Sequence, residues 1–494
     1  MSVKKEPADP LRRAGFAFQT HTELQVASVG TDMPKIISPI DGRVVAERAY
    51  ATQAEVGAAL DDAHRAQQQW KKARLIDRAK LCSAAVRALL EMAGSIAPEL
   101  ALQMGRPVRY GVGEVERTAE RARYMIQIAP AALADHVPAP LDGFRRLIRR
   151  EPLGTVLVIA PWNYPYLSAV NSVVPALMAG NAVVLKHATQ TLLVGERFQA
   201  AFDRAELPNG LFRNLVLDHE QTANIIRSGR VHQVNFTGSV AAGREIERAA
   251  AGTFIGTGLE LGGKDPAYVR EDANLAYAIE NIADGAFFNS GQSCCAVERV
   301  YVHKRHFDRV VAGLVEVASK YVVGNPLDPD TTLGPMVNAS AADFVRSQIR
   351  EAVEQGARRL VPPSLFAPDK PSSAYLAPEV LVNVNHDMAI MKEETFGPVV
   401  GVMPVESDED AIRLMNDSPY GLAASIWTED VDAAERIGAR IETGTVYMNR
   451  CDYLDPALAW TGVKETGHGI TLSALGYSTL TRVKSYHLRE VTGG

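Results

Sequence analysis

Cysteine is scarce in this sequence of 494 residues, and this scarcity argues against several protein classes. The four cysteines stand at positions 82, 294, 295 and 451. So few thiols in so long a chain do not form a disulfide framework, and they favour a reducing compartment. No Cys-x-x-Cys pair stands beside a second cluster of ligands, so we expect no metal site.

Long apolar runs are missing as well. No stretch reaches the roughly 20 apolar residues that a membrane-spanning helix needs. Residues 1–10 are charged and lack the apolar core of a secretory signal, and they make a poor transit peptide. We expect residues 1 to about 30 to be a loosely held lead-in. We also expect no membrane partner and a cytoplasmic location.

An excess of positive charge is also absent. The formal net charge is −6 at pH 7 and no basic stripe occurs, so nucleic acid is not an expected partner. Hydrophobic residues make up 47% and charged residues 22% of the chain, the ordinary balance of a globular protein. The length favours two to four domains.

The N-terminal part is predicted to be mainly helical. Ser38 to Gly42 has turn-forming residues between two apolar pieces, which predicts a hairpin. From Thr52 to about Ile128 the apolar spacing is helical, with a break near Gly105. Thr52 and Glu55 have the spacing of a capping box. Cys82 lies inside this helical pattern, so we expect it in the core.

The glycine-rich fingerprint GxGxxG is absent at the first strand–helix turn, although strands and helices alternate there. The apolar pattern predicts strands at 155–160, 182–186, 215–217 and 233–236, and helices at 170–179, 191–201 and 241–251. A second alternating region from residue 261 to about 449 has predicted strands at 299–302, 399–405 and 424–427. Alternation of this kind predicts βαβ units and parallel sheets, so the expected fold class is α/β.

Two adjacent thiols, Cys294 and Cys295, follow the Gly-Gln pair of the segment FFNSGQSCCA at 287–296. A catalytic thiol needs partial access and a nearby base. Taken alone, cysteines after an apolar helical stretch are more often buried core residues. Two further stretches of the sequence shift the interpretation toward a catalytic cysteine.

Glu260 opens the segment ELGGK, where glycines let backbone and ligand approach a carboxylate closely. Asn163 lies in PWNYP, directly after an apolar run that predicts a buried strand. Thiol, carboxylate and amide supply a nucleophile, a base and an oxyanion donor, which are the three parts needed for acyl chemistry on sulfur.

These segments resemble motifs of the aldehyde dehydrogenase superfamily. The matching segments are PWNYP at 161–165, Lys186 after a Val-Val-Leu strand, FTGS at 236–239, ELGGK at 260–264, GQSC at 291–294, EETFGP at 393–398, SPYGLAA at 418–424 and GTVYMN at 444–449. They occur in the order found in the family and cover nearly the whole chain.

The resemblance implies an α/β fold with two doubly wound domains and a small β element for oligomerisation. Residues 1–131 and 151–260 are expected to form the NAD(P)-binding domain, and residues 261–475 the catalytic domain. Residues 132–150 and 476–494 are expected to form the oligomerisation element. Within this element, residues 138–150 are expected to form a hairpin rather than a solvated loop. Residues 478–491 are expected to form a strand. The implied assembly is a homodimer or homotetramer.

The resemblance also implies roles for the three polar groups. Cys294 would attack the carbonyl carbon of an aldehyde, and Asn163 with the Cys294 backbone N–H would hold the oxyanion. Glu260 would activate the water that hydrolyses the thioester. Cys295 is expected to be a structural neighbour, although adjacent thiols can also oxidise reversibly.

NADP and NAD are the cofactors that the resemblance implies. Lys186 is expected at the adenosine ribose, Glu394 at the nicotinamide ribose and Phe396 against the nicotinamide. Gly238 and Ser239 would open the helix that meets the pyrophosphate, since backbone N–H groups at a helix start suit phosphate. The remaining residues expected in the cofactor site are Pro161, Trp162, Thr189 and Leu261.

Five positions make up three departures from the family pattern. Thr189 stands where many members have a glutamate that repels a 2′-phosphate, so NADP becomes admissible beside NAD. Ser172 and Thr471 stand where many members have a lysine and a glutamate that relay protons from the base. Asn171 and Phe288 stand where succinic semialdehyde members have arginines, which argues against a dicarboxylic semialdehyde.

The expected substrate pocket is aromatic and weakly polar, and the aldehyde apolar, either aliphatic or aromatic. The pocket residues are Tyr164, Asn171, Phe288, Tyr453 and Trp460. Aromatic walls also suit a cationic amine, so an amino-, betaine- or semialdehyde remains an alternative. Alternatives of other classes are a CoA-acylating enzyme, which would lack a water-activating carboxylate, and a non-catalytic scaffold, which would lack an intact site.

Overall fold

A computed structural model describes residues 33–490 of the chain. Residues 1–32 and 491–494 lie outside the described residues, and with them the predicted lead-in. The described part begins with an antiparallel hairpin of β1 (Lys35–Ile37) and β2 (Val44–Glu47), joined by the turn predicted at Ser38 to Gly42.

Four helices follow, as the sequence predicts. They are α1 (Gln53–Trp70), α2 (Leu75–Glu91), α3 (Ala93–Met104) and α4 (Val108–Ala132). Thr52 and Glu55 form the expected capping box, and α3 ends at Gly105, whose φ of 84° is the left-handed conformation that glycine tolerates. Cys82 is fully buried, which confirms its place in the core.

A six-stranded sheet follows, with the strand order β18-β8-β7-β4-β5-β6. Its strands are β4 (Thr155–Ala160), β5 (Ala182–His187), β6 (Phe212–Asn214), β7 (Gln233–Thr237), β8 (Gly256–Glu260) and β18 (Gly467–His468). All neighbouring strands are parallel except β18, which runs antiparallel to β8. The strand predicted at 215–217 is wrong in position, because the pairing with β5 falls on Phe212–Asn214 instead.

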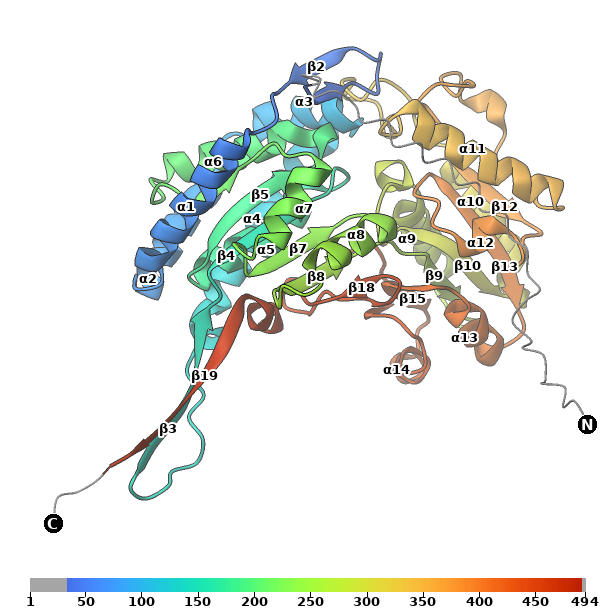
Figure 1. The fold of residues 1–494 in the computed structure, drawn as a ribbon. Helices are drawn as coiled ribbons and strands as arrows, with labels where there is room; N and C mark the ends of the chain where they lie inside the picture. Colours follow the sequence, from blue (N-terminus) through green and yellow to red (C-terminus); the bar gives the residue numbers. More distant parts are fainter. Residues whose placement is uncertain (1–32, 491–494) are drawn as a thin grey trace, which may run out of the picture. The chain divides into compact units, whose positions relative to one another are not determined.

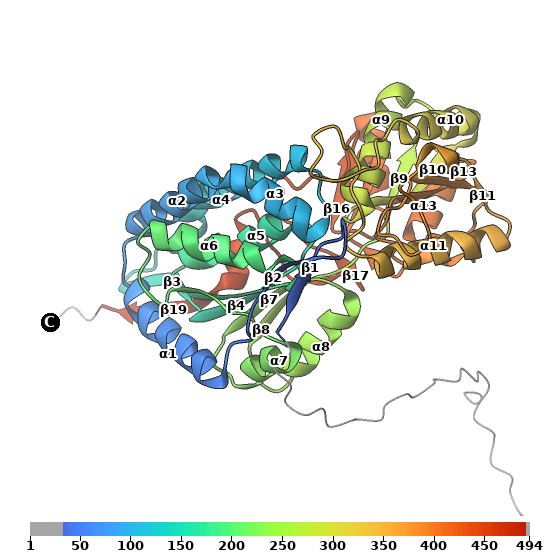
Figure 2. The ribbon, with the colours of Figure 1, turned by 90° about the horizontal axis from the view of Figure 1, so that it is seen from above.

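Helices cover both faces of this sheet. They are α5 (Pro165–Met178), α6 (Leu192–Arg204), α7 (His219–Arg227) and α8 (Val240–Ala250), with a 3-10 turn at Thr189–Thr191. Val156 and Val158 of β4 pack with α2, α4, α5 and α6, whereas Leu157 and Ile159 pack with α1, α7 and α8. The period-two alternation of the strand explains the two helical layers, which Figure 2 shows on opposite sides of the strands.

A seven-stranded sheet carries the second alternating region, with the order β11-β12-β13-β10-β9-β15-β16. Its strands are β9 (Asp265–Val269), β10 (Val297–His303), β11 (Arg358–Arg359), β12 (Glu379–Val382), β13 (Val399–Val405), β15 (Ala423–Trp427) and β16 (Thr445–Met448). Only β11 is antiparallel to its neighbour. The fold class is therefore α/β with parallel sheets, as predicted.

Helices line both faces of this second sheet too. They are α9 (Leu275–Phe287), α10 (Phe307–Ala318), α11 (Ala339–Glu354), α12 (Ala389–Lys392), α13 (Asp408–Asn416) and α14 (Val431–Gly438), with 3-10 turns at Phe288–Gly291, Lys304–His306 and Pro363–Leu365. Val300 and Val302 of β10 pack with α9 and α10 on one face. Tyr301 packs with α11 to α14 on the other.

A two-stranded ribbon projects beside the six-stranded sheet (Figure 1). It consists of β3 (Phe144–Pro152) and β19 (Thr481–Arg489), paired antiparallel from Thr481 with Pro152 to Arg489 with Phe144. The strand predicted at 478–491 begins later, because Leu475–Leu480 forms a 3-10 turn. The rest of the C-terminal region contributes β14 (Tyr420–Gly421) and β17 (Val463–Lys464), which pair with each other.

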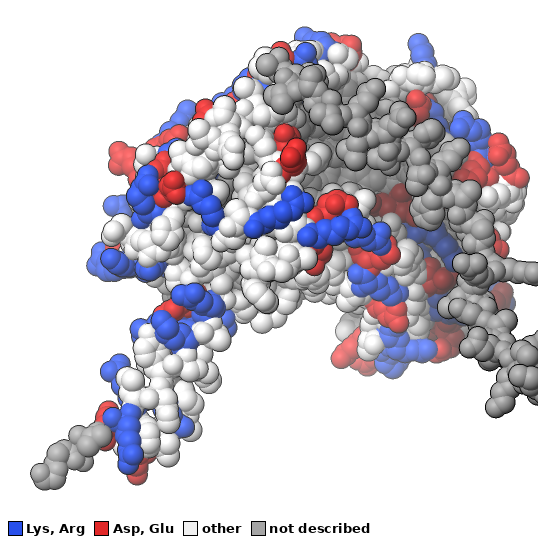
Figure 3. Space-filling view, viewed as in Figure 1, with Lys and Arg blue, Asp and Glu red and all other residues white. Residues whose placement is uncertain are grey.

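No single helix within residues 33–490 has both the length and the apolar composition to cross a membrane. The consecutive helices α2 and α3, bent by 68°, meet these criteria only when taken as a pair. On the face seen in Figure 3, basic and acidic side chains lie among one another.

Candidate active site

Glu260 is the last residue of β8, and Thr237 is the last residue of the neighbouring strand β7. The two residues are partners in the parallel register, and the Thr237 hydroxyl donates a hydrogen bond to Glu260 Oε2 at 3.1 Å. A second hydroxyl, from Thr471, donates to Glu260 Oε1. The carboxylate thus lies at the carboxyl end of a parallel sheet, where ligands of α/β proteins usually bind.

Burial raises the pKa of Glu260 above its ordinary value. The hydrogen bonds from Thr471 and Thr237 and the positive charge of Arg121 oppose that rise. A carboxyl group with a raised pKa accepts a proton more readily than an ordinary glutamate, which suits a general base.

Cys294 follows α9 and a tight left-handed turn. Asn289, Ser290 and Gly291 have φ values of 54°, 57° and 68°. A Cβ atom on Gly291 would lie 2.2 Å from the carbonyl oxygen of Gly397, so this close approach requires glycine. The turn presents Cys294 half-buried with a free thiol, as a nucleophile requires.

Cys295 points to a different environment. It is 4% exposed, and its thiol donates a hydrogen bond to Asp452 Oδ1 at 3.0 Å. The Ser293 hydroxyl donates to the same oxygen at 2.9 Å. Its interaction with Cys294 and its burial raise the pKa of Cys295, so this thiol is a poor nucleophile.

Asn163 is buried, and its side-chain amide donates a hydrogen bond to the Gln292 carbonyl at 3.1 Å. Arg106 donates to the Asn163 carbonyl at 2.7 Å, and Asn289 donates to it at 3.3 Å. These bonds tie Asn163 to the loop that carries the thiol. The second amide hydrogen of Asn163 has no acceptor among the described residues, and Asn163 itself lines neither of the two cavities described next.

A cavity of about 430 Å³, here called the catalytic cavity, contains Cys294 and Glu260 in its wall. All five residues predicted for the substrate pocket line it, namely Tyr164, Asn171, Phe288, Tyr453 and Trp460. Phe288 packs edge-to-face on Tyr110, with ring centroids 5.0 Å apart. The structure therefore brings together the predicted nucleophile, the predicted base and the predicted pocket.

The catalytic cavity is more highly charged than the sequence led us to expect. Helix α4 lines it with Arg109, Arg117 and Arg121, and the carboxylates of Glu120, Asp284 and Asp452 also face it. A further pair, Arg106 and Glu114, forms a buried ion pair in the wall. The arginines recur at helical spacing in the sequence, but that spacing does not tell which side of α4 faces the site.

A second cavity of about 410 Å³, here called the cofactor cleft, lies on the other side of the loop before Cys294. Gln292 lines the cleft, whereas Ser293 lines the catalytic cavity. Four residues predicted to contact the cofactor line the cleft, namely Trp162, Ser239, Glu394 and Phe396. Trp162 and Phe396 pack edge-to-face at 5.6 Å.

Glu394 accepts a hydrogen bond from the Gly263 N–H at 3.1 Å. Burial and the nearby charge of Glu298 raise the pKa of Glu394 to about 7. Ser239 caps α8 through a bond from the Ala242 N–H, and Val240 and Ala241 at the start of the helix line the cleft. Backbone N–H groups at a helix start fit the pyrophosphate of a dinucleotide. The Glu394 carboxylate fits the hydroxyl groups of its ribose.

The other predicted cofactor residues line neither cavity. Pro161 follows β4, and Gly238 and Leu261 lie beside Glu260, where the Gly238 N–H donates to the Glu260 carbonyl. Lys186 is 9% exposed near the end of β5, and burial lowers its pKa. Thr189 is exposed in the 3-10 turn that follows.

A small cavity, about 10 Å³, has Glu260 in its wall but not Cys294. Ser172 and Thr471, which stand at the positions of the family's lysine–glutamate relay, both line it. Asn235 donates a hydrogen bond to the Ser172 hydroxyl at 3.0 Å, and His468 also lines the space. The volume suits about one water molecule.

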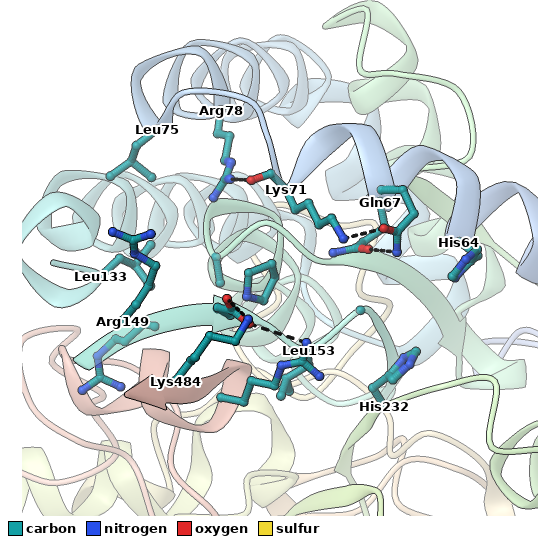
Figure 4. Close-up of a pocket in the computed structure, with 17 residues that line it drawn as sticks. His64, Gln67, Lys71, Leu75, Arg78, Leu133, Arg149, Leu153, His232 and Lys484 are labelled. Carbon is teal, nitrogen blue, oxygen red and sulfur yellow. Dashed lines mark hydrogen bonds and ion pairs between the residues drawn. The ribbon is translucent and has the colours of Figure 1, made fainter. Parts of the chain in front are cut away.

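Another cavity of about 630 Å³ lies at the base of the ribbon, between α1, α2 and the β3–β19 strands (Figure 4). Its charged groups are largely paired: Lys484 binds Glu151 at 2.7 Å, and Arg78 donates to the Met178 and Lys71 carbonyls. It holds no thiol, so we place no chemistry there. Within residues 33–490, no three histidines, cysteines or carboxylates are grouped to hold a metal ion.

The chain is similar in sequence and structure to proteins of one family. A sequence model of the Aldehyde dehydrogenase family matches residues 26–486. A relative named succinate-semialdehyde dehydrogenase [NADP(+)], from Deinococcus radiodurans, is 32% identical over 91% of this chain and 93% of its own length.

Solved structures agree with the sequence match. The succinic semialdehyde dehydrogenase of Streptococcus pyogenes in complex with NADP+ has a TM-score of 0.87 at 28% identity, covering 92% of this chain and 99% of its own. PnpE in complex with nicotinamide adenine dinucleotide has a TM-score of 0.89 at 30% identity, covering 94% and 95%.

These similarities confirm the resemblance, the fold class and the enzyme class predicted from the sequence, and NADP and NAD are the cofactors named for the relatives. With a match across nearly its whole length, the chain belongs to the aldehyde dehydrogenase family.

Proposed function

We propose that this protein oxidises an aldehyde to a carboxylic acid with NADP or NAD, by a hydrolytic mechanism on Cys294. One observation supports this most directly. The accessible thiol of Cys294 and the carboxylate of Glu260 line the same cavity, and Gln292, two residues before Cys294, lines the cofactor cleft.

The first step is the addition of the Cys294 thiolate to the carbonyl carbon of the aldehyde, which forms a thiohemiacetal. Negative charge develops on the carbonyl oxygen. The Cys294 N–H and the free amide hydrogen of Asn163 are the donors available to that charge, and donors fixed in advance stabilise it without reorganisation. The bonds from Arg106 and Asn289 to the Asn163 carbonyl keep this amide in position.

The residues of the cofactor cleft fit a nicotinamide dinucleotide. Glu394 would hold ribose hydroxyls, and the start of α8 would hold the pyrophosphate, while Phe396 and Trp162 supply a flat apolar wall. When bound, the dinucleotide supplies an acceptor for the hydride of the substrate. Cys294 is then left as a thioester.

Hydrolysis of the thioester needs a proton acceptor for the attacking water, and Glu260 supplies it. The hydroxyls of Thr471 and Thr237 hold its carboxylate. Many relatives are expected to pass the proton onward through lysine and glutamate. Here Ser172, Thr471 and the small cavity between them offer a route with one water molecule.

We include NADP as a cofactor on the basis of Lys186 and Thr189. No carboxylate stands at position 189 to repel a 2′-phosphate. Two like charges about 4 Å apart repel each other by about 4 kcal/mol at an effective dielectric near 20. Without a carboxylate at position 189, the 2′-phosphate of NADP does not meet this repulsion. Both succinate-semialdehyde dehydrogenases described above are named with NADP as cofactor.

For the aldehyde, the semialdehyde alternative now has more support than an apolar substrate. Three arginines of α4 line the cavity beside the aromatic residues, and the relatives' names include succinate semialdehyde. A CoA-acylating enzyme is disfavoured, because Glu260 is present and lies at the cavity.

The test is the absorbance of reduced nicotinamide with purified protein, a panel of aldehydes, and NADP or NAD, with and without CoA. Cys294→Ala should abolish oxidation while cofactor still binds, measured by quenching of tryptophan fluorescence. Cys295→Ala is the matched control and should retain most activity, because its thiol serves Asp452 rather than the substrate.

Oxidation by Cys294→Ala, or loss of activity only in Cys295→Ala, would show that the thiol is wrongly assigned. A product that forms only with CoA would exclude the hydrolytic mechanism.

A further inference from the structure

Arg121 of α4 is a partly buried cation in the wall of the catalytic cavity. Its Nη1 donates to the Leu167 carbonyl at 3.2 Å and lies 3.4 Å from Asn171 Oδ1. Both acceptors are neutral and belong to α5, which packs against α4. They orient the guanidinium but do not balance its charge.

No carboxylate lies within 4 Å of Arg121 anywhere in residues 33–490. Its Nε and Nη2 have no acceptor in that part of the chain, and neither atom is sealed from the cavity. A charge removed from water without a counter-ion is costly, so buried cations are normally paired. The unpaired Nε–Nη2 edge is the side of arginine that binds a carboxylate with two parallel hydrogen bonds.

The acidic groups of the cavity do not fill this role. Asp452 accepts its bonds from Ser293 and Cys295, and Glu260 accepts its bonds from Thr237 and Thr471. Glu120 and Asp284 are exposed. The third inner carboxylate, Glu114, pairs with Arg106. Each of the three inner carboxylates is therefore engaged elsewhere.

Two more arginines extend the positive edge of α4 toward solvent. Arg117 lies one turn before Arg121, and Arg109 lies two turns further toward the helix start; both are exposed and line the cavity. Arg117 has no ion pair within the described residues, and Arg109 lies over the Tyr110 ring at 5.5 Å. Such a row attracts anions from solution toward the inner guanidinium.

We propose that Arg121 binds a carboxylate at the far end of the aldehyde substrate, so that the enzyme prefers ω-oxo carboxylic acids to neutral aldehydes. This inference rests on the proposed function and names its substrate class. It makes Arg121 a specificity-determining residue, and it places the recognition of the anion on α4.

Arg121 also lies within electrostatic range of Glu260 and Cys294. A role confined to those groups would change the rate with every aldehyde equally. A role in binding the substrate anion changes the rate only with charged substrates. The two roles therefore differ in a measurable way.

The experiment compares kcat/KM for 4-oxobutanoate and its methyl ester, which differ mainly in charge, in wild type and Arg121→Gln. We expect wild type to prefer the acid at least about tenfold. Arg121→Gln should lose at least about thirtyfold with the acid, about 2 kcal/mol, mainly through KM, and less than threefold with the ester. Arg121→Lys should have a kcat/KM for the acid between those of wild type and Arg121→Gln, since a single ammonium replaces the two-pronged guanidinium.

Arg123→Gln is the matched control, because Arg123 is exposed on α4 and outside the cavity; it should leave both substrates unchanged. Cofactor binding and thermal unfolding of Arg121→Gln verify that it folds. Glyceraldehyde 3-phosphate and 4-aminobutanal test phosphate and amine in place of carboxylate.

Equal losses of acid and ester in Arg121→Gln would overturn the inference, as would a wild-type preference for the ester, the phosphate or the amine. Wild type that oxidises the ester but not the acid would leave the proposed function standing and remove this inference alone. Wild type that oxidises no aldehyde of the panel would overturn both.

Discussion

At the scale of single residues, the two hydroxyls on Glu260 set the state of the proposed base. Burial raises the pKa of this carboxyl, and the bonds from Thr471 and Thr237 lower it. Both hydroxyls stabilise the ionised form because they donate to it. The base is therefore tuned by a balance between burial and donated hydrogen bonds.

Thr471→Val should raise the pKa of Glu260 further, because one donor to the carboxylate is lost. A group with a higher pKa remains protonated to a higher pH, so the acid limb of the kcat–pH profile should move upward. Activity should fall more at pH 6 than at pH 8. Steady-state rates from pH 5 to 9 measure the shift.

Thr257→Val is the control, since Thr257 lies on the same strand but donates to Glu247. Its profile should match wild type. An unchanged profile in Thr471→Val would mean that Glu260 does not limit turnover in the acidic range.

Some site residues could be predicted from the sequence and others could not, for a physical reason. Cys294, Glu260 and Asn163 lie in short segments where glycine, proline and polar residues are concentrated. Arg121 and Asp452 do not lie in segments of such distinctive composition. Arg121 becomes part of the site only because α4 packs on α5, and Asp452 because its backbone has φ of 46° beside Ser293.

At the scale of elements, Glu298 of β10 connects three segments of the site. Its carboxylate accepts bonds from the Thr395 and Phe396 N–H groups and from Lys264 Nζ. Lys264 is 1% exposed, and burial lowers its pKa while Glu298 opposes the change. The loop with Glu394 and Phe396 is thereby held to the sheet.

Glu298→Gln should destabilise the protein by about 3–5 kcal/mol, because Lys264 loses its buried counter-ion and all three partners of the side chain are donors. The KM for cofactor should also rise. Denaturant unfolding and cofactor titration measure these effects. Glu316→Gln, which breaks an exposed pair with Lys320, should leave the stability almost unchanged. Equal stabilities of the two variants would contradict this prediction.

Most elements could be predicted because their apolar pattern matches one regular period. β4 and β5 are buried on both faces and appear in the sequence as continuous apolar runs bounded by turns. The strand near 215 was misplaced because apolar residues occur on both sides of Asn214, at 211–212 and at 215–217. Only pairing with β5 decides between them, and that contact is not local in sequence.

At the scale of the whole molecule, the ribbon of β3 and β19 exposes apolar side chains. Val483 is 68% exposed and Leu488 48% exposed on β19, and Val137 is 69% exposed nearby. An isolated two-stranded ribbon is only marginally stable in water. We therefore expect a second copy of the chain to cover it, in the dimer or tetramer implied by the family.

Val483→Lys should weaken that assembly, because a charge would enter the interface. Light scattering after size-exclusion chromatography should show a smaller particle than wild type. Val431→Lys, at a position 64% exposed on α14, should leave the particle mass unchanged. A wild-type monomer, or no effect of Val483→Lys, would show that the ribbon is not the interface.

The hydrogen bond between Thr471 and Glu260 joins residues 211 positions apart. A ribosome adding about 5–20 residues per second needs about 10–40 s to cover that distance. Until then β8 has no β18 beside it, and its open edge is a hazard for aggregation. A nascent chain already carries Cys294, the proposed nucleophile, before Thr471 can donate its hydrogen bond to Glu260, the proposed base. Synthesis itself thus delays activity.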